Sequence, residues 1–152
     1  MEKDEISDIQ YGYIRQSFSY KNWKNVEISL AGEFQIQNGA LALEAVNQLR
    51  KLGLSLPNEA VYAGMKEAKW VGRFTVMSQN PLVILDGAHN PQAAEALRKS
   101  LELYFKGKKL YYVLGFFRIR TIRKLLSLPH LLQNILLRWR HRIILVPFRQ
   151  RS

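Results

Sequence analysis

A change of pattern near the middle of the chain most constrains its fold. The apolar run from Pro81 to Leu85 ends in the small and polar residues Asp86 to Asn90, and apolar residues then return at helical spacing. Asn90 followed by Pro91 predicts a helix start, because the Asn side chain caps a free backbone N–H and proline suits the first helical position. The stretch therefore predicts strand, loop and helix in succession, as is typical of α/β folds.

Apolar runs and alternating patterns predict further strands. The predicted strands cover residues 9–20, 26–31, 74–78, 82–85 and 110–114. A polar turn at 21–25 separates the first two, and the turn signal Gln-Asn-Pro at 79–81 separates the next two. The run at 110–114 is continuously apolar, which favours a strand buried on both faces. With the strand at 82–85 and the helix between them, it predicts a parallel α/β unit.

Three segments have the period of a helix with one buried stripe. The stripe of the longest is Ile36, Ala40, Leu43, Val46 and Leu49, with Gly53 as a stop signal. A shorter helix is predicted at 59–68, after Pro57 and Asn58. The third helix begins at Pro91, and its stripe is Ala94, Leu97, Leu101 and Tyr104, followed by Gly107.

Composition excludes several classes of protein. The 152 residues include no cysteine, which excludes disulfides and thiolate metal sites. The N-terminal residues MEKDEISD are acidic and polar, whereas a signal peptide is basic and then apolar. Apolar runs are also too short for a membrane span. We therefore expect a cytoplasmic globular protein.

The net charge of +11 is concentrated at one end of the chain. Residues 1–102 carry 11 Lys and Arg against 12 Asp and Glu, whereas residues 103–152 carry 12 basic residues and no acidic one. From residue 116 leucines and arginines mix without a clear period, and Pro129 interrupts what would otherwise be a helix. A basic tail suits nucleic acid. A shifted reading frame gives the same pattern, and composition does not separate the two.

Asp86 and His89 are the first candidate binding residues. Asp86 follows a strand at the carboxyl end, where open α/β sheets place ligands, and its carboxylate suits ribose hydroxyls. His89 precedes a helix N-terminus, where free N–H groups and the helix dipole favour phosphate. The alternative is an ordinary turn, with Asp86 stabilising it and His89 solvated.

Gln35, Asn38 and Arg73 are further candidates. Gln35 and Asn38 share a face of the longest helix, and their carboxamides could bind the donor and acceptor edge of adenine. The alternative is a pair of polar residues on the solvated face. Arg73, in a loop after Trp70 and Gly72, could stack on a base or bind phosphate, or be a surface arginine. His130 and His141 lie in the tail and are assigned no role.

The usual nucleotide-binding loops are missing from the sequence. Gly107-Lys108 would need a glycine at position 102 to complete a P-loop, but Glu102 is there, and Lys109 replaces the serine or threonine. There is no GxGxxG motif. A phosphate cradle, if the chain has a nucleotide partner, is therefore expected elsewhere.

Three motifs in order resemble one family. They are Leu30-Ala-Gly-Glu-Phe-Gln-Ile-Gln-Asn38 with the following GALALEAV, Trp70-Val-Gly-Arg-Phe74, and Leu85-Asp-Gly-Ala-His-Asn-Pro91. Over roughly residues 18–115 the chain is similar to folylpolyglutamate synthases and dihydrofolate synthases, a branch of the Mur ligase superfamily. The resemblance implies an α/β fold in two parts. Residues 1–72 would be the C-terminal end of the central ATPase domain, and 73–152 an incomplete Rossmann-like ligase domain.

The resemblance also implies a function. These ligases use ATP and Mg²⁺ to activate the carboxylate of a folate or dihydropteroate, which then forms an amide with L-glutamate. Gln35 and Asn38 would lie beside adenine, Arg73 would contact the nucleotide, Asp86 would bind the ribose, and His89 would face the phosphates as the candidate catalytic residue. The family is usually monomeric and cytoplasmic, and the resemblance implies neither a membrane nor a nucleic acid as partner.

The chain departs from the family pattern in three places. Phe34 stands where the family usually has histidine. The P-loop, the magnesium ligands and most of the folate site would belong upstream of Met1. After Gly115 the family has an Asp-Lys-Asp segment, whereas this chain has Phe-Phe-Arg-Ile-Arg. We therefore expect part of a ligase that is inactive alone, and assign no metal ligand to it. The alternatives are a nucleic-acid-binding protein that uses the basic tail, with Trp139 and Phe148, or an unstable product.

Overall fold

The structure, a computed structural model, describes residues 5–115, 135–139 and 142–145. The chain divides into two compact units, residues 1–87 and 88–152. Within the described residues, no helix is both long and apolar enough to span a membrane.

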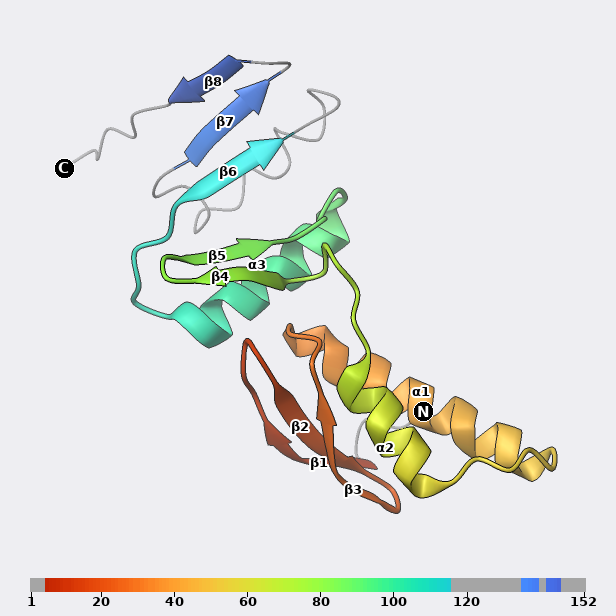
Figure 1. The fold of residues 1–152 in the computed structure, drawn as a ribbon. Coiled ribbons are helices and arrows are strands. Elements are labelled where there is room, and N and C mark those ends of the chain that lie inside the picture. Colours follow the sequence, from red (N-terminus) through yellow and green to blue (C-terminus); the bar gives the residue numbers. More distant parts are fainter. Residues whose placement is uncertain (1–4, 116–134, 140–141, 146–152) are drawn as a thin grey trace. The chain divides into compact units, whose positions relative to one another are not determined.

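The first unit begins with a three-stranded antiparallel sheet (Figure 1). Its strands are β1 (Ile6–Gln10), β2 (Gln16–Tyr20) and β3 (Trp23–Ile28), in that spatial order. The predicted strand at 9–20 is therefore two strands. The turn between β2 and β3 is shorter than predicted, because Tyr20 pairs with Trp23 and leaves only Lys21 and Asn22 between them.

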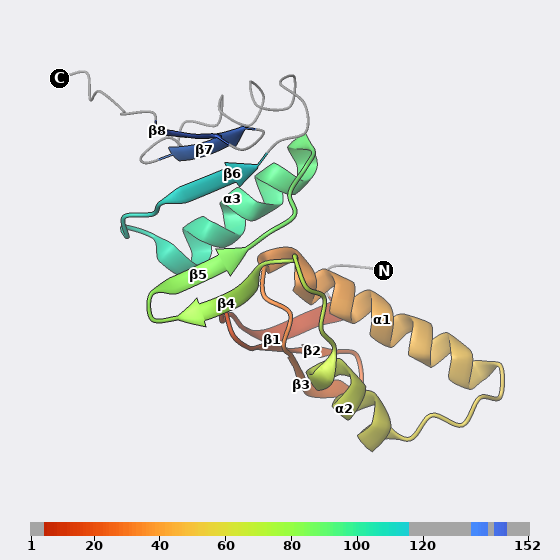
Figure 2. The same cartoon turned by 45° about the horizontal axis from the view of Figure 1, so that its top comes forward.

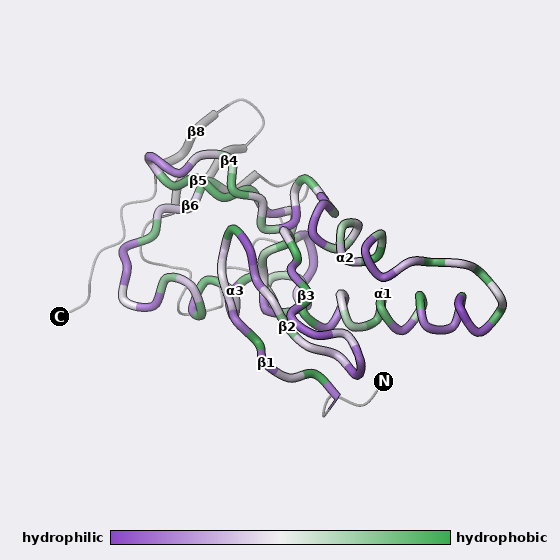
Figure 3. The backbone as a smooth tube through the Cα atoms, turned by 60° about the horizontal axis from the view of Figure 1, so that its bottom comes forward, coloured by the Kyte–Doolittle hydropathy of each residue, from purple (hydrophilic) through white to green (hydrophobic). Residues whose placement is uncertain are grey.

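Two helices cover one face of this sheet. α1 (Glu33–Lys51) and α2 (Asn58–Glu67) confirm two predicted helices. Along α1 the tube in Figure 3 alternates between hydrophobic and hydrophilic segments within its turns, as one buried stripe requires. The stripe is buried at Ile36, Ala40 and Leu43, but Leu49 is exposed. The core of the unit is formed by Phe18, Tyr20, Trp23, Val26 and Ile28 of the sheet with Ile36, Ala40 and Leu43 of α1.

Hydrogen bonds and one ion pair attach α2 to β3 and the residue after it. The Tyr62 hydroxyl donates to the Lys24 carbonyl at 2.9 Å and accepts from the Lys24 N–H at 3.1 Å. The Ser29 hydroxyl donates to the carbonyl of Lys66 at 2.6 Å, and the Lys66 ammonium lies 2.6 Å from the Glu27 carboxylate. Since no residue of α2 is fully buried, these polar contacts supplement a modest apolar contact.

A two-stranded hairpin completes the first unit. β4 (Thr75–Gln79) and β5 (Leu82–Leu85) pair antiparallel, with Asn80 and Pro81 as the turn (Figure 2). Both strands and the turn between them confirm the sequence prediction.

The second unit contains α3 (Pro91–Phe105) and a sheet of β6 (Tyr112–Gly115), β7 (Ile135–Trp139) and β8 (Arg142–Leu145). α3 confirms the third predicted helix, and the Asn90 Oδ1 accepts from the Ala93 N–H at 2.8 Å as the predicted cap. β6 pairs parallel with β7, and β7 antiparallel with β8.

One prediction about β6 is wrong. Tyr111 and Val113 are 72% and 71% exposed, so the run at 110–114 is not buried on both faces. β5 lies in the first unit and β6 in the second, so the predicted parallel unit of these two strands stays a prediction. An apolar run indicates that a strand needs cover and a partner, but it does not specify which strand supplies them.

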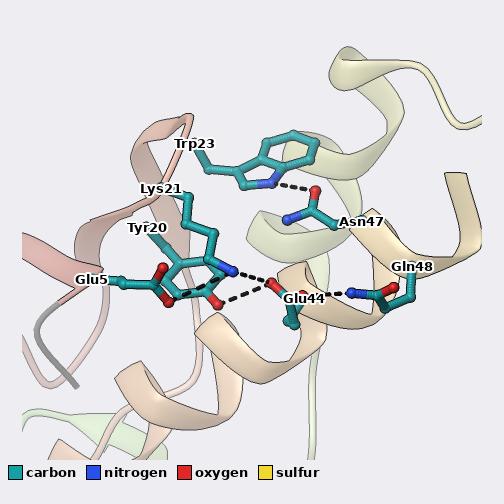
Figure 4. Close-up of polar contacts among 7 residues, drawn as sticks. All are labelled: Glu5, Tyr20, Lys21, Trp23, Glu44, Asn47 and Gln48. Atoms are coloured by element: carbon teal, nitrogen blue, oxygen red, sulfur yellow. Dashed lines mark hydrogen bonds and ion pairs between the residues drawn. The ribbon is translucent and has the colours of Figure 1, made fainter. Parts of the chain in front are cut away.

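A polar cluster fixes the β2–β3 turn to α1. One carboxylate oxygen of Glu44 accepts from the Tyr20 hydroxyl at 3.0 Å and from the Lys21 ammonium at 2.8 Å, and the other accepts from Gln48 at 2.7 Å (Figure 4). The Lys21 ammonium also lies 3.6 Å from the Glu5 carboxylate. These hydrogen bonds, the one from Lys21 foremost, lower the pKa of Glu44 from 4.5 to about 2.

This cluster predicts an acid-dependent loss of stability. Because folding lowers the pKa of Glu44, its contribution is complete above pH 4.5 and is lost as the pH falls toward 2. Glu44→Gln should therefore show a shallower fall in the free energy of unfolding between these pH values, measured by urea denaturation. Glu59→Gln, on the exposed surface of α2, is the control for charge, and an equal change in both variants would contradict the role of Glu44.

Candidate functional site

A buried glutamine holds the turn that precedes α1. The carboxamide Nε2 of Gln16, a residue 2% exposed, donates to the carbonyls of Leu30 at 2.7 Å and Gly32 at 3.0 Å. Gly32 has a φ of 110°, which favours glycine, and the ring of Phe34 lies so close that a Cβ there would come within 2.8 Å of it. Phe34 thus packs on the turn, and its ring offers no polar contact where histidine was expected.

Gln16 was missed in the sequence analysis. Gln16 precedes the apolar residues Phe18 and Tyr20 by two and four positions, so a strand starting at Gln16 places all three on the same, buried face. A polar residue at such a position needs hydrogen-bond partners, and this requirement was the available signal.

Gln35 and Asn38 lie in the first two turns of α1, as predicted, and contact each other. The Asn38 Nδ2 donates to the Gln35 Oε1 at 2.9 Å. Gln35 is 3% exposed and Asn38 is exposed, so the solvated-face alternative is wrong for Gln35. The two carboxamides therefore form one joined polar group at the start of the helix.

Arg73 lies in the loop between α2 and β4. Its guanidinium carbon lies 5.4 Å from the centroid of the Trp70 ring, and the backbone N–H of Arg73 donates to the Trp70 carbonyl at 3.2 Å. Both side chains line a cavity of about 270 Å³ within the first unit. The other residues lining this cavity include Tyr13, Ile14, Leu30, Lys69 and Phe74, and none of its lining residues is acidic. Arg73 is therefore partly buried beside an indole that is itself 63% exposed, and both interpretations of this arginine stay predictions.

Asp86 joins the end of β5 to the same loop. Its Oδ2 accepts from the Phe74 N–H at 2.8 Å, and the next residue, Gly87, donates its N–H to the Gly72 carbonyl at 2.7 Å. The structural alternative predicted for Asp86 is thus present, although the carboxylate stabilises a segment 12 residues away rather than its own turn. This partner had no signal in the sequence.

His89 belongs to the second unit and is exposed. It precedes the Asn90 cap of α3, as predicted from the sequence. The structure thus brings Gln35 to Asn38, and Asp86 to the loop of Arg73, within the first unit, whereas His89 lies in the second unit.

No group of three or more histidine, aspartate or glutamate side chains within the described residues is arranged to hold a metal ion. The described part of the chain offers carboxamides, a guanidinium near an indole and a carboxylate, the groups that suit a nucleoside.

Comparison with known proteins identifies relatives. The family of the Mur ligase glutamate ligase domain matches residues 72–136. The dihydrofolate synthase/folylpolyglutamate synthase of Bacillus subtilis is 32% identical over 103 residues, which cover 64% of this chain and 24% of that protein.

Two solved structures extend this likeness. A folylpolyglutamate synthase from Thermotoga maritima is 31% identical with a TM-score of 0.64, covering 88% of this chain and 32% of that one. The Mycobacterium tuberculosis folylpolyglutamate synthase, solved in complex with ADP and AMPPCP, is 27% identical with a TM-score of 0.56, covering 73% and 26%.

The chain thus spans about a quarter to a third of the length of these relatives. Its second half has the mixed α/β structure of a Mur ligase C-terminal domain. These matches support a fragment that is similar to the folylpolyglutamate synthase and dihydrofolate synthase branch of the Mur ligase superfamily.

Proposed function

We propose that this chain supplies the adenosine side of the ATP site of a folate-glutamate ligase. The proposed reaction uses ATP to activate the carboxylate of a folate or dihydropteroate as an acyl phosphate, which the amine of L-glutamate attacks to form an amide. The Mycobacterium tuberculosis relative, solved with ADP and AMPPCP, supports a nucleotide as the ligand.

The joined carboxamides of Gln35 and Asn38 carry this proposal. Their mutual hydrogen bond uses one acceptor of Gln35 and one donor of Asn38. Each carboxamide has both a donor and an acceptor, so the Gln35 Nε2 can still donate to a ligand and the Asn38 Oδ1 can still accept from one. Adenine presents an acceptor beside its exocyclic amino donor, which this pair complements. Burial of Gln35 restricts its side chain, so less conformational freedom is lost on binding.

The remaining predicted residues take the other parts of the nucleotide. Arg73 provides a guanidinium whose orientation is restrained by the indole of Trp70. We assign the ribose hydroxyls to Asp86 and the phosphates to His89, which precedes the N-terminus of α3. In this proposal His89 acts on the phosphate side as the candidate catalytic residue. The boundary between the ATPase part and the ligase part is proposed at residues 72 and 73, where the family match begins.

The P-loop and the magnesium ligands are proposed to lie outside these 152 residues. Phosphoryl transfer depends on positioning and charge neutralisation, so half a site is expected to bind nucleotide weakly and to be inactive. The purified chain with ATP, Mg²⁺, folate and L-glutamate should release no glutamate-dependent ADP. Rapid turnover by the chain alone would contradict this part of the proposal.

Nucleotide binding is best tested by NMR titration of the full chain with millimolar AMPPCP. We expect the side-chain amides of Gln35 and Asn38 and the Arg73 Nε–H to shift on binding. Gln35→Met should raise the dissociation constant about tenfold. This is the effect of losing one hydrogen bond worth about 1.4 kcal/mol.

Gln37→Met is the matched control, because it makes the same change at an exposed position of the same helix. It should leave the affinity unchanged. If the titration gives no shifts at Gln35 and Asn38, or if Gln35→Met and Gln37→Met lose the same affinity for AMPPCP, the adenine assignment is overturned.

The alternative of nucleic-acid binding by the basic tail stays a prediction from the sequence. Residues 116–134, 140–141 and 146–152, which carry most of the tail, lie outside the described residues. Deletion of residues 116–152 should abolish such binding, and binding should weaken steeply with salt.

A further inference from the structure

The loop at 70–75 has an unfavourable backbone conformation. Phe74 has a φ of 48°, in the left-handed region that large side chains rarely adopt, and Gly72 has a φ of 85°. The Phe74 side chain is 2% exposed, so its ring is fixed by packing. A left-handed aromatic residue persists only where its surroundings hold it.

Hydrogen bonds from two directions hold this loop. From within, the Gly72 N–H donates to the Thr75 Oγ1 at 3.0 Å, and the Arg73 N–H donates to the Trp70 carbonyl at 3.2 Å. From the end of β5, Asp86 accepts from the Phe74 N–H at 2.8 Å. The bond to Asp86 is charge-assisted and is made at the strained residue itself.

We propose that Asp86 is a positioning residue for Arg73. Its carboxylate holds Phe74 in the left-handed conformation, and this conformation sets the direction in which the adjacent Arg73 leaves the backbone. The guanidinium then lies over the Trp70 ring, at the edge of the cavity that both residues line. That Arg73 binds a nucleotide from this position rests on the function proposed above. That Asp86 holds Arg73 in this position does not.

A close approach of backbones makes the arrangement specific. A Cβ at Gly87 would lie 3.1 Å from the Gly72 carbonyl oxygen, tighter than usual. A side chain at position 87 would therefore require the Gly72 carbonyl to move by a few tenths of an ångström. This contact places the Asp86 carboxylate at the Phe74 N–H.

The test measures the contact between Arg73 and Trp70 in the full chain without ligand. A guanidinium over an indole experiences a ring-current shift, so the Arg73 Hε resonance reports the contact, and Trp70→Leu gives its value without the ring. We expect Asp86→Ala to move this resonance to the Trp70→Leu value. Asp86→Asn should largely preserve it, because an asparagine oxygen still accepts from the Phe74 N–H.

Thr75→Val provides a second test, since it removes the hydrogen bonds of the Thr75 hydroxyl with the Gly72 N–H and the Trp70 carbonyl without altering Asp86. It should shift the Arg73 resonance in the same direction. Glu67→Ala, at an exposed position of α2, is the control and should leave the resonance unchanged. An unchanged Arg73 resonance in folded Asp86→Ala, or in Thr75→Val if Asp86→Ala does not fold, would overturn the inference.

The two proposals fail in different ways. If AMPPCP does not bind but the Arg73 resonance responds to Asp86→Ala as expected, the proposed function is wrong and the positioning role stands. If AMPPCP binds but the Arg73 resonance is unchanged in Asp86→Ala and in Thr75→Val, the positioning role is wrong and the nucleotide site stands.

Discussion

Phe18→Ala is expected to lower the free energy of unfolding of the first unit by about 3–5 kcal/mol. Phe18 is 0% exposed, and its ring packs under α1 beside the core residues of the sheet. Removing the ring loses its transfer free energy and leaves a cavity that a sheet and two helices cannot easily close. Since domains are commonly stable by only about 5–15 kcal/mol, the variant should be largely unfolded at moderate urea concentrations.

The measurement is urea denaturation followed by circular dichroism. Leu52→Ala is the control, because its side chain is 77% exposed and should change the stability by no more than about 0.5 kcal/mol. A loss below about 1 kcal/mol for Phe18→Ala would mean that the core formed by β2 and α1 is not the main source of stability.

Gly39→Ala is expected to destabilise the protein although it lies in the middle of a helix. Alanine ordinarily favours a helix over glycine by about 1 kcal/mol. At position 39, however, a Cβ would lie 2.8 Å from the Phe18 Cζ and 3.3 Å from the Met65 Cε. Since Phe18 is fully buried, its ring cannot move freely, and overpacking costs about 1–3 kcal/mol. We expect overpacking to exceed the helix propensity, with a net loss of up to about 2 kcal/mol.

Gly64→Ala is the matched control for this prediction. Position 64 is also helical, in α2, but a Cβ there would meet nothing within 4 Å. The same substitution should therefore stabilise the protein by about 0.5–1 kcal/mol. If both variants gain stability in thermal or urea denaturation, the close approach of α1 to Phe18 is contradicted.

The sequence predicted elements well where one local signal decided them. The apolar stripe of α1 and the Asn90 cap of α3 are confirmed, because helical period and capping depend on residues a few positions apart. The predicted strand at 110–114 exists as β6. Its predicted burial on both faces is wrong, because Val113 is exposed, so an apolar run predicts a strand but not how deeply it is buried. Burial and strand pairing depend on segments far away in the chain.

The candidate site shows the same division. The shared face of Gln35 and Asn38 follows from their spacing in a helix, and their hydrogen bond agrees with it. The bond from Phe74 to Asp86 could not be predicted, because it needs a left-handed residue that no turn signal marks. Gln16 was within reach of the sequence, since it occupies an inward position of an alternating strand.

The surroundings of Trp23 and Trp70 give the first unit two intrinsic optical reporters with different origins. Trp23 is 5% exposed, donates from its indole to Asn47 at 3.1 Å, and lies edge-on to Tyr62 at 5.5 Å. Its emission should therefore be blue-shifted and should change only when α1 or α2 leaves the sheet. Trp70 is 63% exposed, so its red-edge emission should respond to solutes that enter the cavity beside Arg73. Once Trp139, the third tryptophan of the chain, is replaced by phenylalanine, a single fluorescence spectrum is expected to distinguish loss of the fold from occupation of the site.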